Sequence, residues 1–310
     1  MTLKIQKWYG RTGNNMQICA VGILIAIKKK TKFECIGSKI IKPFKLDFGK
    51  SLENFSSSFF WNGNSNTPNI SSLKLYQEIY IIFQKYITNN IDIPSVKVPD
   101  KTLVIHIRSG DIFYGKGAHR DYVPNPYIYY LKLIELYDEV LVVTEPDENN
   151  PILKKLRENP KVKIQSKSIR EDFATLMGAK NLATSGVGTF AIAAAMCSKK
   201  LKNLYCSEKI LHRHLNYHML NNPKINIYIC ELKRYINIGD WANSRSQRLQ
   251  IINYNGIINF KKYKKNKLNL FFISFFTDIK LIYIQSIRKL LLTLRYKKLL
   301  KIIKILLKNQ

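Results

Sequence analysis

One stretch of the chain combines an imidazole, a permanent cation and a carboxylate within six residues. The segment 103–107 is apolar except for His106, and polar residues from Arg108 to Asp111 follow it. This pattern predicts a buried parallel strand that ends at the carboxyl edge of a sheet, where nucleotides and phosphates bind in α/β proteins. The guanidinium of Arg108 suits a phosphate, and His106 can donate or accept a hydrogen bond. The alternative is a structural ion pair between Arg108 and Asp111.

A glycine-containing turn near the start of the chain could approach an anion with its backbone. Residues 10–15, Gly-Arg-Thr-Gly-Asn-Asn, lie between a predicted first strand at 3–9 and an apolar helix predicted over 18–28. Glycine lets backbone N–H groups approach a ligand, and a helix N-terminus favours negative charge. The turn therefore predicts a cradle for an anion or a sugar ring, although a strand-to-helix turn without a ligand fits the same residues.

A second glycine loop occupies residues 185–190, Ser-Gly-Val-Gly-Thr-Phe. It follows a predicted strand and opens a predicted helix, so the amides of Gly188 and Thr189, with the Thr189 hydroxyl, could hold a phosphate. Upstream of this loop, Asp172 has two interpretations. It either caps a helix N-terminus or accepts a hydrogen bond from the edge of a nucleobase.

Strands and helices alternate at short intervals in the central part of the chain, which is typical of a doubly wound parallel sheet. The predicted strands are 103–107, 140–144, 162–164, 181–184 and 202–205, and the predicted helices are 127–136, 151–158, 169–177 and 191–196. Before this region, residues 71–89 predict a helix and residues 33–70 predict a variable, loop-rich surface. The stretch 90–100, which contains Pro94 and Pro99, predicts an interdomain linker.

The composition indicates a folded, strongly basic protein. The chain has 310 residues and a formal net charge of +30, from 51 Lys and Arg against 21 Asp and Glu. Such a charge implies anionic partners such as phosphates, nucleic acid or acidic lipid. Half of the excess lies in residues 241–310, where sixteen Lys or Arg accompany a single acid, Asp278. The hydrophobic content of 46% and the aromatic content of 12% argue against general disorder.

The cysteines and histidines predict no metal site. The five cysteines form no CxxC pair and indicate a reducing compartment. His212, His214 and His218 are spaced by two and four residues, but no Cys or carboxylate accompanies them. We therefore interpret them as surface or interface histidines. The apolar run 18–27 is too short to span a bilayer, and no signal-peptide cleavage pattern follows it.

The segment from residue 261 predicts a basic amphipathic helical tail. Lys297, Lys301, Lys304 and Lys308 fall on one helical face, opposite a stripe of Leu and Ile. Such a helix favours a membrane interface, with its lysines toward anionic headgroups. Packing on the rest of the chain or on a partner is the alternative. Nucleic acid is disfavoured, because binding to phosphates needs no apolar stripe.

Three separated motifs together resemble the fucosyltransferase superfamily, which groups bacterial α1,2-fucosyltransferases, α1,6-fucosyltransferases and protein O-fucosyltransferases. The turn at 10–15 is similar to the family's N-terminal G-R-x-G-N-Q loop, with Asn15 in place of Gln. Residues 106–111 resemble its H-x-R-x-x-D motif, and residues 172–190 resemble its segment of an acid followed by a phosphate loop. The resemblance covers about residues 3–210.

The resemblance implies a GT-B fold, in which two Rossmann-like domains face a cleft. The acceptor domain would be 1–95, the nucleotide-sugar domain 96–240 and the basic tail 241–310. It further implies that Arg108 contacts the β-phosphate and stabilises charge on the departing GDP, with Asp111 orienting Arg108. The other implied roles are His106 and Asp172 on the nucleotide, Gly188 and Thr189 on the diphosphate, Asn14 on the sugar or acceptor side, and Gly13, Ser185 and Phe190 in the same binding loops.

Two departures from the family pattern leave questions open. Some relatives place a carboxylate base five residues after the motif's Asp, where this chain has Lys116. The base could instead be Asp121, His119 or Glu145, or the reaction could need little help from a base. A more usual Ser or Gln is also replaced within residues 188–189, so the identity of the donor sugar stays open.

The sequence thus predicts an inverting, metal-independent glycosyltransferase that moves fucose from GDP-fucose to a glycan acceptor in surface polysaccharide synthesis. Neutralising the leaving diphosphate lowers the barrier to an oxocarbenium-like transition state. The expected partners are the nucleotide sugar, a glycan or lipid-linked glycan, and an anionic membrane surface, with no nucleic acid and no metal or other cofactor. The expected location is cytoplasmic, at the inner face of the membrane. The alternatives are another nucleotide sugar, or a non-catalytic basic protein that binds membrane or nucleic acid.

Overall fold

The computed structural model describes residues 2–5, 7–8, 10–49, 73–114, 119–147, 149–212 and 214–264. The predicted helical tail beyond residue 264, most of the loop-rich region before residue 73, and Lys116 lie outside these residues. Within the described residues, the chain is an α/β protein with one large and one small sheet. No described helix combines the length and the apolar character that crossing a membrane requires.

The large sheet has seven strands. All neighbouring strands run parallel except β9 and β10, which are antiparallel. Its strands are β4 (Leu103–Ile107), β5 (Val140–Thr144), β6 (Val162–Gln165), β7 (Asn181–Ala183), β8 (Asn203–Ser207), β9 (Asn226–Cys230) and β10 (Phe260–Lys262). Their order is β10-β9-β8-β7-β4-β5-β6. The chain therefore proceeds outward from β4 in one direction, returns to β7 beside β4, and proceeds outward in the other. This is the doubly wound order, and its switch point lies between β4 and β7.

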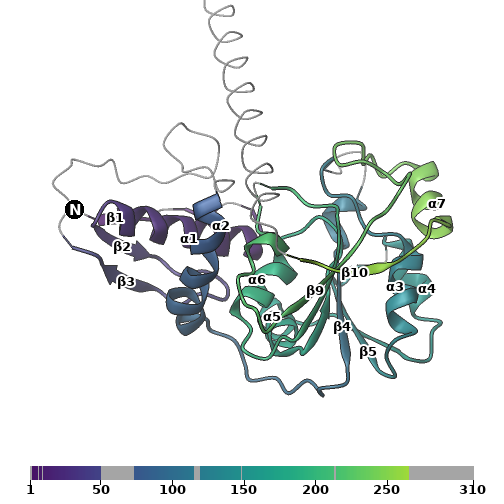
Figure 1. Cartoon of the computed structure of the whole chain (residues 1–310), viewed down its shortest axis with the longest axis horizontal. Coiled ribbons are helices and arrows are strands. Elements are labelled where there is room, and N and C mark those ends of the chain that lie inside the picture. Colours follow the sequence, from purple (N-terminus) through teal and green to yellow (C-terminus); the bar gives the residue numbers. More distant parts are fainter. Residues whose placement is uncertain are drawn as a thin grey trace, which may run out of the picture.

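Helices cover both faces of this sheet because its central strands are apolar on both sides. In β4, Leu103, Ile105 and Ile107 face one core, and Val104 faces the other. The first core includes α3 (Tyr127–Ile134), α4 (Pro151–Leu156) and α7 (Arg245–Asn253). The second includes α5 (Ile169–Gly178) and α6 (Phe190–Cys197). Figure 1 shows α3, α4 and α7 on the right of the sheet and α5 and α6 on the left.

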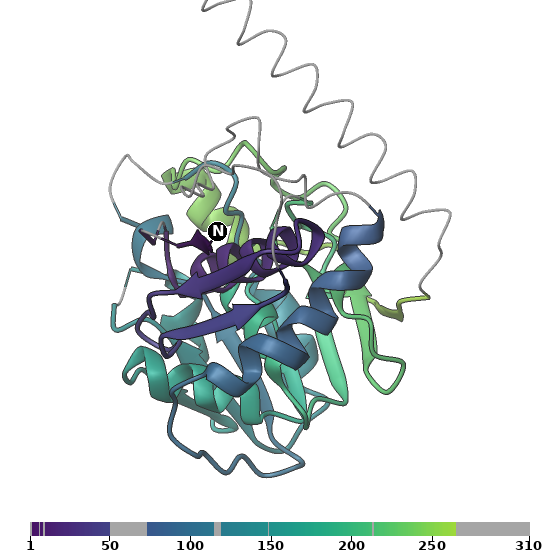
Figure 2. The same ribbon diagram turned by 90° about the vertical axis from the view of Figure 1, so that its left-hand side faces the viewer.

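The small sheet consists of β1 (Thr2–Lys4), β2 (Lys32–Cys35) and β3 (Phe44–Asp47), in that spatial order. β1 and β2 are parallel, and β2 and β3 are antiparallel. The helices of this unit are α1 (Thr12–Lys28) and α2 (Leu73–Ile82), and a π-helical turn at Phe83–Ile87 continues α2. Figure 2 shows this unit in front of the large sheet.

One hydrophobic core joins the small sheet to the large one. It runs from Phe33 of β2 through α1 to α6 and the β4 residue Val104. α1 packs against β2, α2 and α6, and it is buried along nearly its whole length from Thr12 to Ala26. A helix that is apolar all round requires such cover. The large sheet and the small unit are therefore packed directly together.

Several predicted boundaries differ from the structure. The first helix begins at Thr12, six residues earlier than predicted, so most of the glycine turn is helical. The strands β2 and β3 lie in the region that we expected to be loops. The helix α7 and the strand β10 lie in residues assigned to the tail. Because α7 packs on α3 and α4, and β10 pairs with β9, residues up to about 262 belong to the large-sheet unit.

Candidate functional site

The predicted site residues lie mostly at the carboxyl ends of β4 and β7, on the two sides of the switch point. The loops that follow these strands meet in a bridge between Pro124 and Gly186. Gly186 has φ +92°, and a Cβ there would lie 2.6 Å from the Val123 carbonyl oxygen, so the close approach requires glycine. The buried Asn125 ties the loops further by donating to the Thr184 carbonyl at 3.0 Å.

The N-termini of α1 and α6 touch each other at this point. A Cβ on Gly13 would lie 2.6 Å from the carbonyl carbon of Thr189 and 2.7 Å from the amide nitrogen of Phe190. The Thr189 hydroxyl donates to the side-chain oxygen of Asn14 at 2.9 Å. The structure thus brings together Gly13, Asn14, Thr189 and Phe190, which lie about 175 residues apart in the chain.

Neither of these helix N-termini is capped by a side chain, and neither has an acidic residue in its first turn. The first N–H groups of a helix have no partner within the helix, and the helix dipole places partial positive charge there. Two such ends side by side form a site suited to an anion with several oxygen atoms. In the second loop, a Cβ on Gly188 would lie at an ordinary 3.5 Å from the Ser185 hydroxyl oxygen, so these two residues are neighbours.

Arg108 is held in one orientation by two neighbours. Its Nη2 contacts the two carboxylate oxygens of Asp111 at 2.9 and 3.1 Å, and its Nε lies 3.3 Å from one of them. Its guanidinium carbon lies 3.9 Å from the centre of the Tyr122 ring, a stacking contact that the sequence did not reveal. The predicted pair between Arg108 and Asp111 is therefore present, and its geometry is compatible with both a binding and a structural role.

A second arginine, Arg11, joins this pair from the N-terminus of α1. Its Nη2 lies 3.5 Å from the Asp111 carboxylate, and its Nη1 contacts Glu145. Partial burial and the nearby Arg108 lower the pKa of Arg11, whereas Asp111 opposes this shift. Asp111 therefore lies between two guanidinium groups. The sequence indicates Arg11 only as part of the glycine turn and Glu145 only as a candidate base, and it does not indicate that the two are partners.

The turn after Arg108 is supported by the loop after β5. Asp147 accepts hydrogen bonds from the Ser109 hydroxyl at 2.8 Å and from the Gly110 amide at 2.7 Å. Asn150 donates to the Arg108 carbonyl at 3.1 Å and also caps α4. Neither Asp147 nor Asn150 was predicted from the sequence. The Asp-x-x-Asn spacing before a proline at the start of a helix is the feature that could have indicated a cap.

His106 lies beneath the site and faces α6. It is 8% exposed, and its ring centre lies 5.4 Å from that of Phe190. Burial, reinforced by the positive charges of Arg108 and Arg11, lowers the pKa of His106 to about 3. At neutral pH the ring is therefore uncharged, and it can act only as a neutral donor or acceptor.

Acidification should therefore weaken the fold through His106. Between pH 6.5 and about 3 the unfolded chain binds a proton at His106 that the folded chain does not bind. The free energy of unfolding then falls by about 1.4 kcal/mol per pH unit, or about 2 kcal/mol from pH 6.5 to 5. In urea unfolding at these pH values, the free energy of unfolding should fall less in His106→Gln than in the wild type. An equal fall in the two proteins would contradict the assignment of this pH dependence to His106. The control, His119→Gln, should behave as the wild type does.

Asp172 does not cap a helix, so this interpretation was wrong. Ser168 caps α5, in a capping box with Glu171. Asp172 instead accepts from the Gln165 side chain at 2.8 Å and from the Lys167 amide at 3.3 Å. Burial raises its pKa, and these hydrogen bonds oppose the shift. Its neighbour Phe173 packs on Phe190 with the ring centres 5.5 Å apart, which connects α5 to the loop 185–190.

The other titratable candidates are placed as follows. The His119 ring lies 4.8 Å from that of Tyr122, the residue under Arg108, and Asp121 follows in the same loop. His214 and His218 are buried, which contradicts the first of their two interpretations, as surface or interface histidines. His218 forms a hydrogen bond of 2.7 Å with the Tyr263 hydroxyl. Among the described residues there is no group of three or more His, Cys, Asp or Glu that could hold a metal ion.

The structure thus brings four elements together in one candidate site. Two guanidinium groups and two helix N-termini converge where the order of the large sheet reverses. Such a convergence favours a ligand with adjacent phosphate groups. No protein-family model matches the chain, and no curated protein does.

Proposed function

We propose that the chain is a glycosyltransferase that transfers a sugar, fucose in the first instance, from a GDP-linked donor to a glycan acceptor. The observation that carries the proposal is the pairing of Arg108 and Arg11 through Asp111, beside the joined N-termini of α1 and α6. A diphosphate leaving group carries the charge that this arrangement suits. The switch point of a doubly wound sheet is also where such folds bind nucleotides.

In this proposal the chemistry rests on stabilising the departing nucleotide. Negative charge develops on the β-phosphate as the bond to the sugar breaks, and Arg108 would meet it with a planar fork already fixed by Asp111 and Tyr122. Pre-fixed donors need no reorganisation during the reaction. The acceptor would attack from the opposite side of the sugar, which gives inversion, and no step requires a metal.

The proposal also assigns parts to the two sheets. The large sheet would bind the nucleotide, and Asp172 would contact its nucleobase. The small unit would contribute Asn14, which would contact the sugar and the acceptor. This is the two-domain GT-B arrangement. Attachment of the enzyme to the inner face of a membrane through residues 265–310 and a role in surface polysaccharide synthesis belong to the same proposal and rest on the sequence.

The test is calorimetric titration of the purified full-length protein with GDP, GDP-fucose, UDP and CMP. GDP and GDP-fucose should bind selectively. Arg108→Ala should weaken their binding about 100-fold, because it removes a fork that makes two charge-assisted hydrogen bonds. Arg157→Ala, which removes an exposed arginine at the end of α4, is the matched control and should bind like the wild type.

Each other outcome has a definite meaning. Selective binding of UDP would retain a glycosyltransferase but change the donor. No binding of any nucleotide to a protein shown to be folded would contradict the enzyme and favour a basic binding protein. Equal losses in the two arginine variants would show that net charge, rather than the site, holds the nucleotide.

A further inference from the structure

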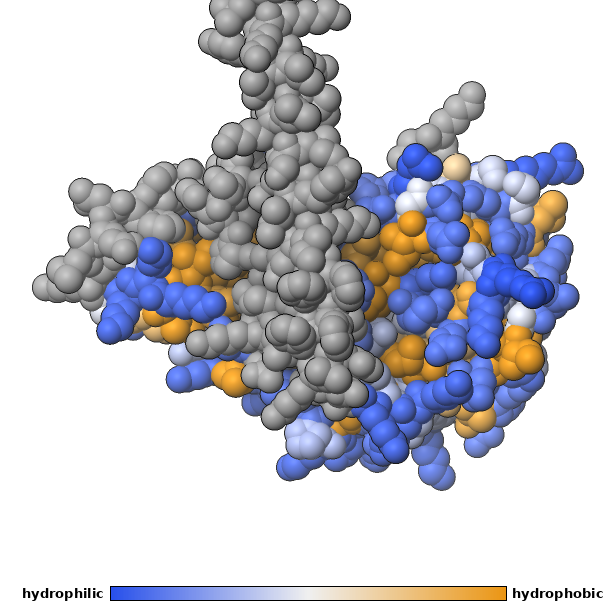
Figure 3. All heavy atoms as spheres, turned by 45° about the horizontal axis from the view of Figure 1, so that its top comes forward, coloured by the Kyte–Doolittle hydropathy of each residue, from blue (hydrophilic) through white to orange (hydrophobic). Residues whose placement is uncertain are grey.

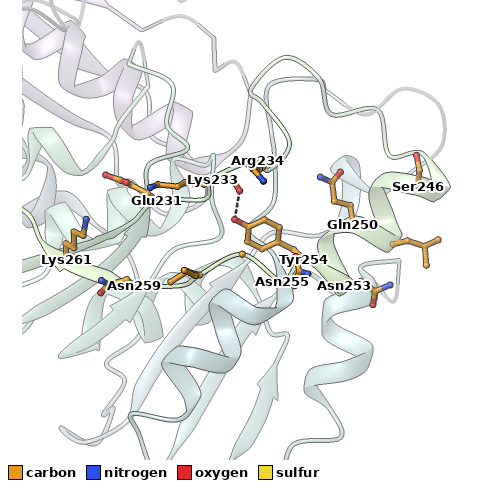
Figure 4. A pocket seen from close by; sticks show the side chains of 13 residues that line it. Glu231, Lys233, Arg234, Ser246, Gln250, Asn253, Tyr254, Asn255, Asn259 and Lys261 are labelled. Atoms are coloured by element: carbon orange, nitrogen blue, oxygen red, sulfur yellow. Dashed lines mark hydrogen bonds between the residues drawn. The ribbon is translucent and has the colours of Figure 1, made fainter.

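A cavity of about 780 Å³ opens at the far end of the large sheet, away from Arg108. It lies between the segment after β9, the helix α7 and the residues that lead into β10 (Figure 4). Its polar lining consists mainly of amides and hydroxyls. These residues are Gln250, Asn253, Asn255, Asn259, Ser246 and Tyr254. Amides and hydroxyls both donate and accept hydrogen bonds, as the hydroxyl groups of a sugar require.

The cavity is also positively charged. Lys233, Arg234 and Lys261 line it, against one carboxylate, Glu231. Across the described parts of the chain, none of these three cations forms an ion pair. Arg234 has φ +56°, a backbone conformation that is costly for a residue with a Cβ and that tends to be kept at functional sites.

Tyr254 provides a flat surface in the middle of the cavity (Figure 4). Its hydroxyl donates to the Lys233 carbonyl at 2.7 Å, and its ring packs edge-on against Tyr235 at 5.0 Å. A Cβ on Gly256 would overlap the Tyr254 ring, so glycine is required beside it. The negative face of an aromatic ring attracts the C–H face of a sugar. A fixed ring surrounded by amides is thus suited to a carbohydrate.

The helix α7, which forms one wall of the cavity, is tied to the loop that follows Arg108. Arg248 of α7 donates to the Phe113 carbonyl at 2.8 Å, and Trp241 donates to the Ile112 carbonyl at 2.8 Å. Tyr114, which is 76% exposed, comes next in that loop. β9 and β4 are three strand spacings apart, or about 14 Å. Because these strands are parallel, residues 231–234 after β9 and Arg108 after β4 lie at the same edge of the sheet, so an extended chain molecule of a few units would span the two places.

We infer that this cavity binds an acidic glycan, namely the part of the acceptor chain that does not react. The amides and Tyr254 would hold sugar rings, and Lys233, Arg234 and Lys261 would pair with carboxylates on them. Only the identification of this glycan as the acceptor rests on the proposed function. Figure 3 shows hydrophilic side chains spread over much of the face that it draws, so a matched control is needed.

The test uses a hyaluronan hexasaccharide and its carboxyl-reduced, neutral form, titrated into the full-length protein at moderate salt. The acidic form should bind, and Lys233→Gln with Lys261→Gln should weaken it at least about tenfold by removing two charged contacts. Arg234→Gly should also weaken binding while leaving stability unchanged or raised, because glycine adopts this backbone freely. The control, Lys163→Gln with Lys224→Gln, makes the same change of charge at exposed sites elsewhere and should bind normally.

Three results would overturn the inference: no binding of the hexasaccharide to the folded wild type, equal binding of the neutral form, or an equal loss in the control variant. GDP titration of the same proteins separates this inference from the proposed function. If the hexasaccharide binds in the cavity and GDP does not bind, the glycan site stands and the transferase fails. If GDP binds and the hexasaccharide does not, the proposed nucleotide site stands and the glycan site in the cavity fails.

Discussion

Gly13→Ala is expected to lower the free energy of unfolding by about 3 kcal/mol and to abolish nucleotide binding. The added methyl group would meet backbone atoms of Thr189 and Phe190 at 2.6–2.7 Å, and a backbone cannot move aside as a side chain can. Alanine favours a helix by about 1 kcal/mol over glycine, so the overlap outweighs a real gain. The N-terminus of α1 would move away from α6, and the two sets of N–H groups would no longer face one anion.

Urea unfolding and GDP titration of the same variant measure both effects. Gly22→Ala is the matched control, because it makes the same change in the same helix. Its methyl group would meet the edge of the Phe33 ring at 2.7 Å, far from the site. It should lose stability but bind GDP normally. Normal GDP binding by Gly13→Ala would show that the contact between the two helices does not form the binding site.

Trp241→Ala is expected to cost about 4 kcal/mol of stability, in the range for a large buried aromatic side chain. Trp241 is fully buried, and its ring packs edge-on against Phe113 at 5.5 Å. Trp241→Phe keeps most of the packing but leaves the Ile112 carbonyl without its donor, at a cost of about 1–3 kcal/mol. Because Ile112 follows Asp111 directly, we expect GDP binding to weaken in both variants.

Chemical unfolding and calorimetry check these values, and Trp8→Phe is the comparison. Trp8 also donates its indole N–H to a backbone carbonyl, that of Gly37, but in the small unit. Its substitution should cost stability without a comparable loss of GDP affinity. If Trp241→Phe binds GDP as the wild type does, the anchoring of the loop by Trp241 is structural only.

The central strands could be read from the sequence because burial on both faces makes them continuous apolar runs. β4 and β5 are of this kind. The edge strand β10 could not be predicted from the sequence, because Lys261 and Lys262 are exposed and resemble part of a charged tail. Charged residues on an edge strand prevent pairing with other chains, which is why such strands resemble loops in a sequence.

In the candidate site, contacts between residues close in the sequence could be predicted, and contacts between distant residues could not. The pairing of Arg108 with Asp111 spans three residues and was predictable from spacing. The contact of Arg11 with Glu145 spans 134 residues, and nothing in either segment indicates the other. The capping box Ser168-x-x-Glu171 was readable and would have excluded Asp172 as a cap. The placement of residues 13–14 and 189 in one site was expected only from the resemblance of the two loops to one family, and their direct contact was not predicted.

The burial of α1 has a consequence for protein synthesis. α6, which packs against α1, is made about 160 residues after it, a delay of roughly 10–30 s at typical translation rates. During that time the apolar residues 16–26 lack part of their cover on the ribosome. The yield of folded protein should therefore depend on chaperones that hold this helix until translation reaches α6.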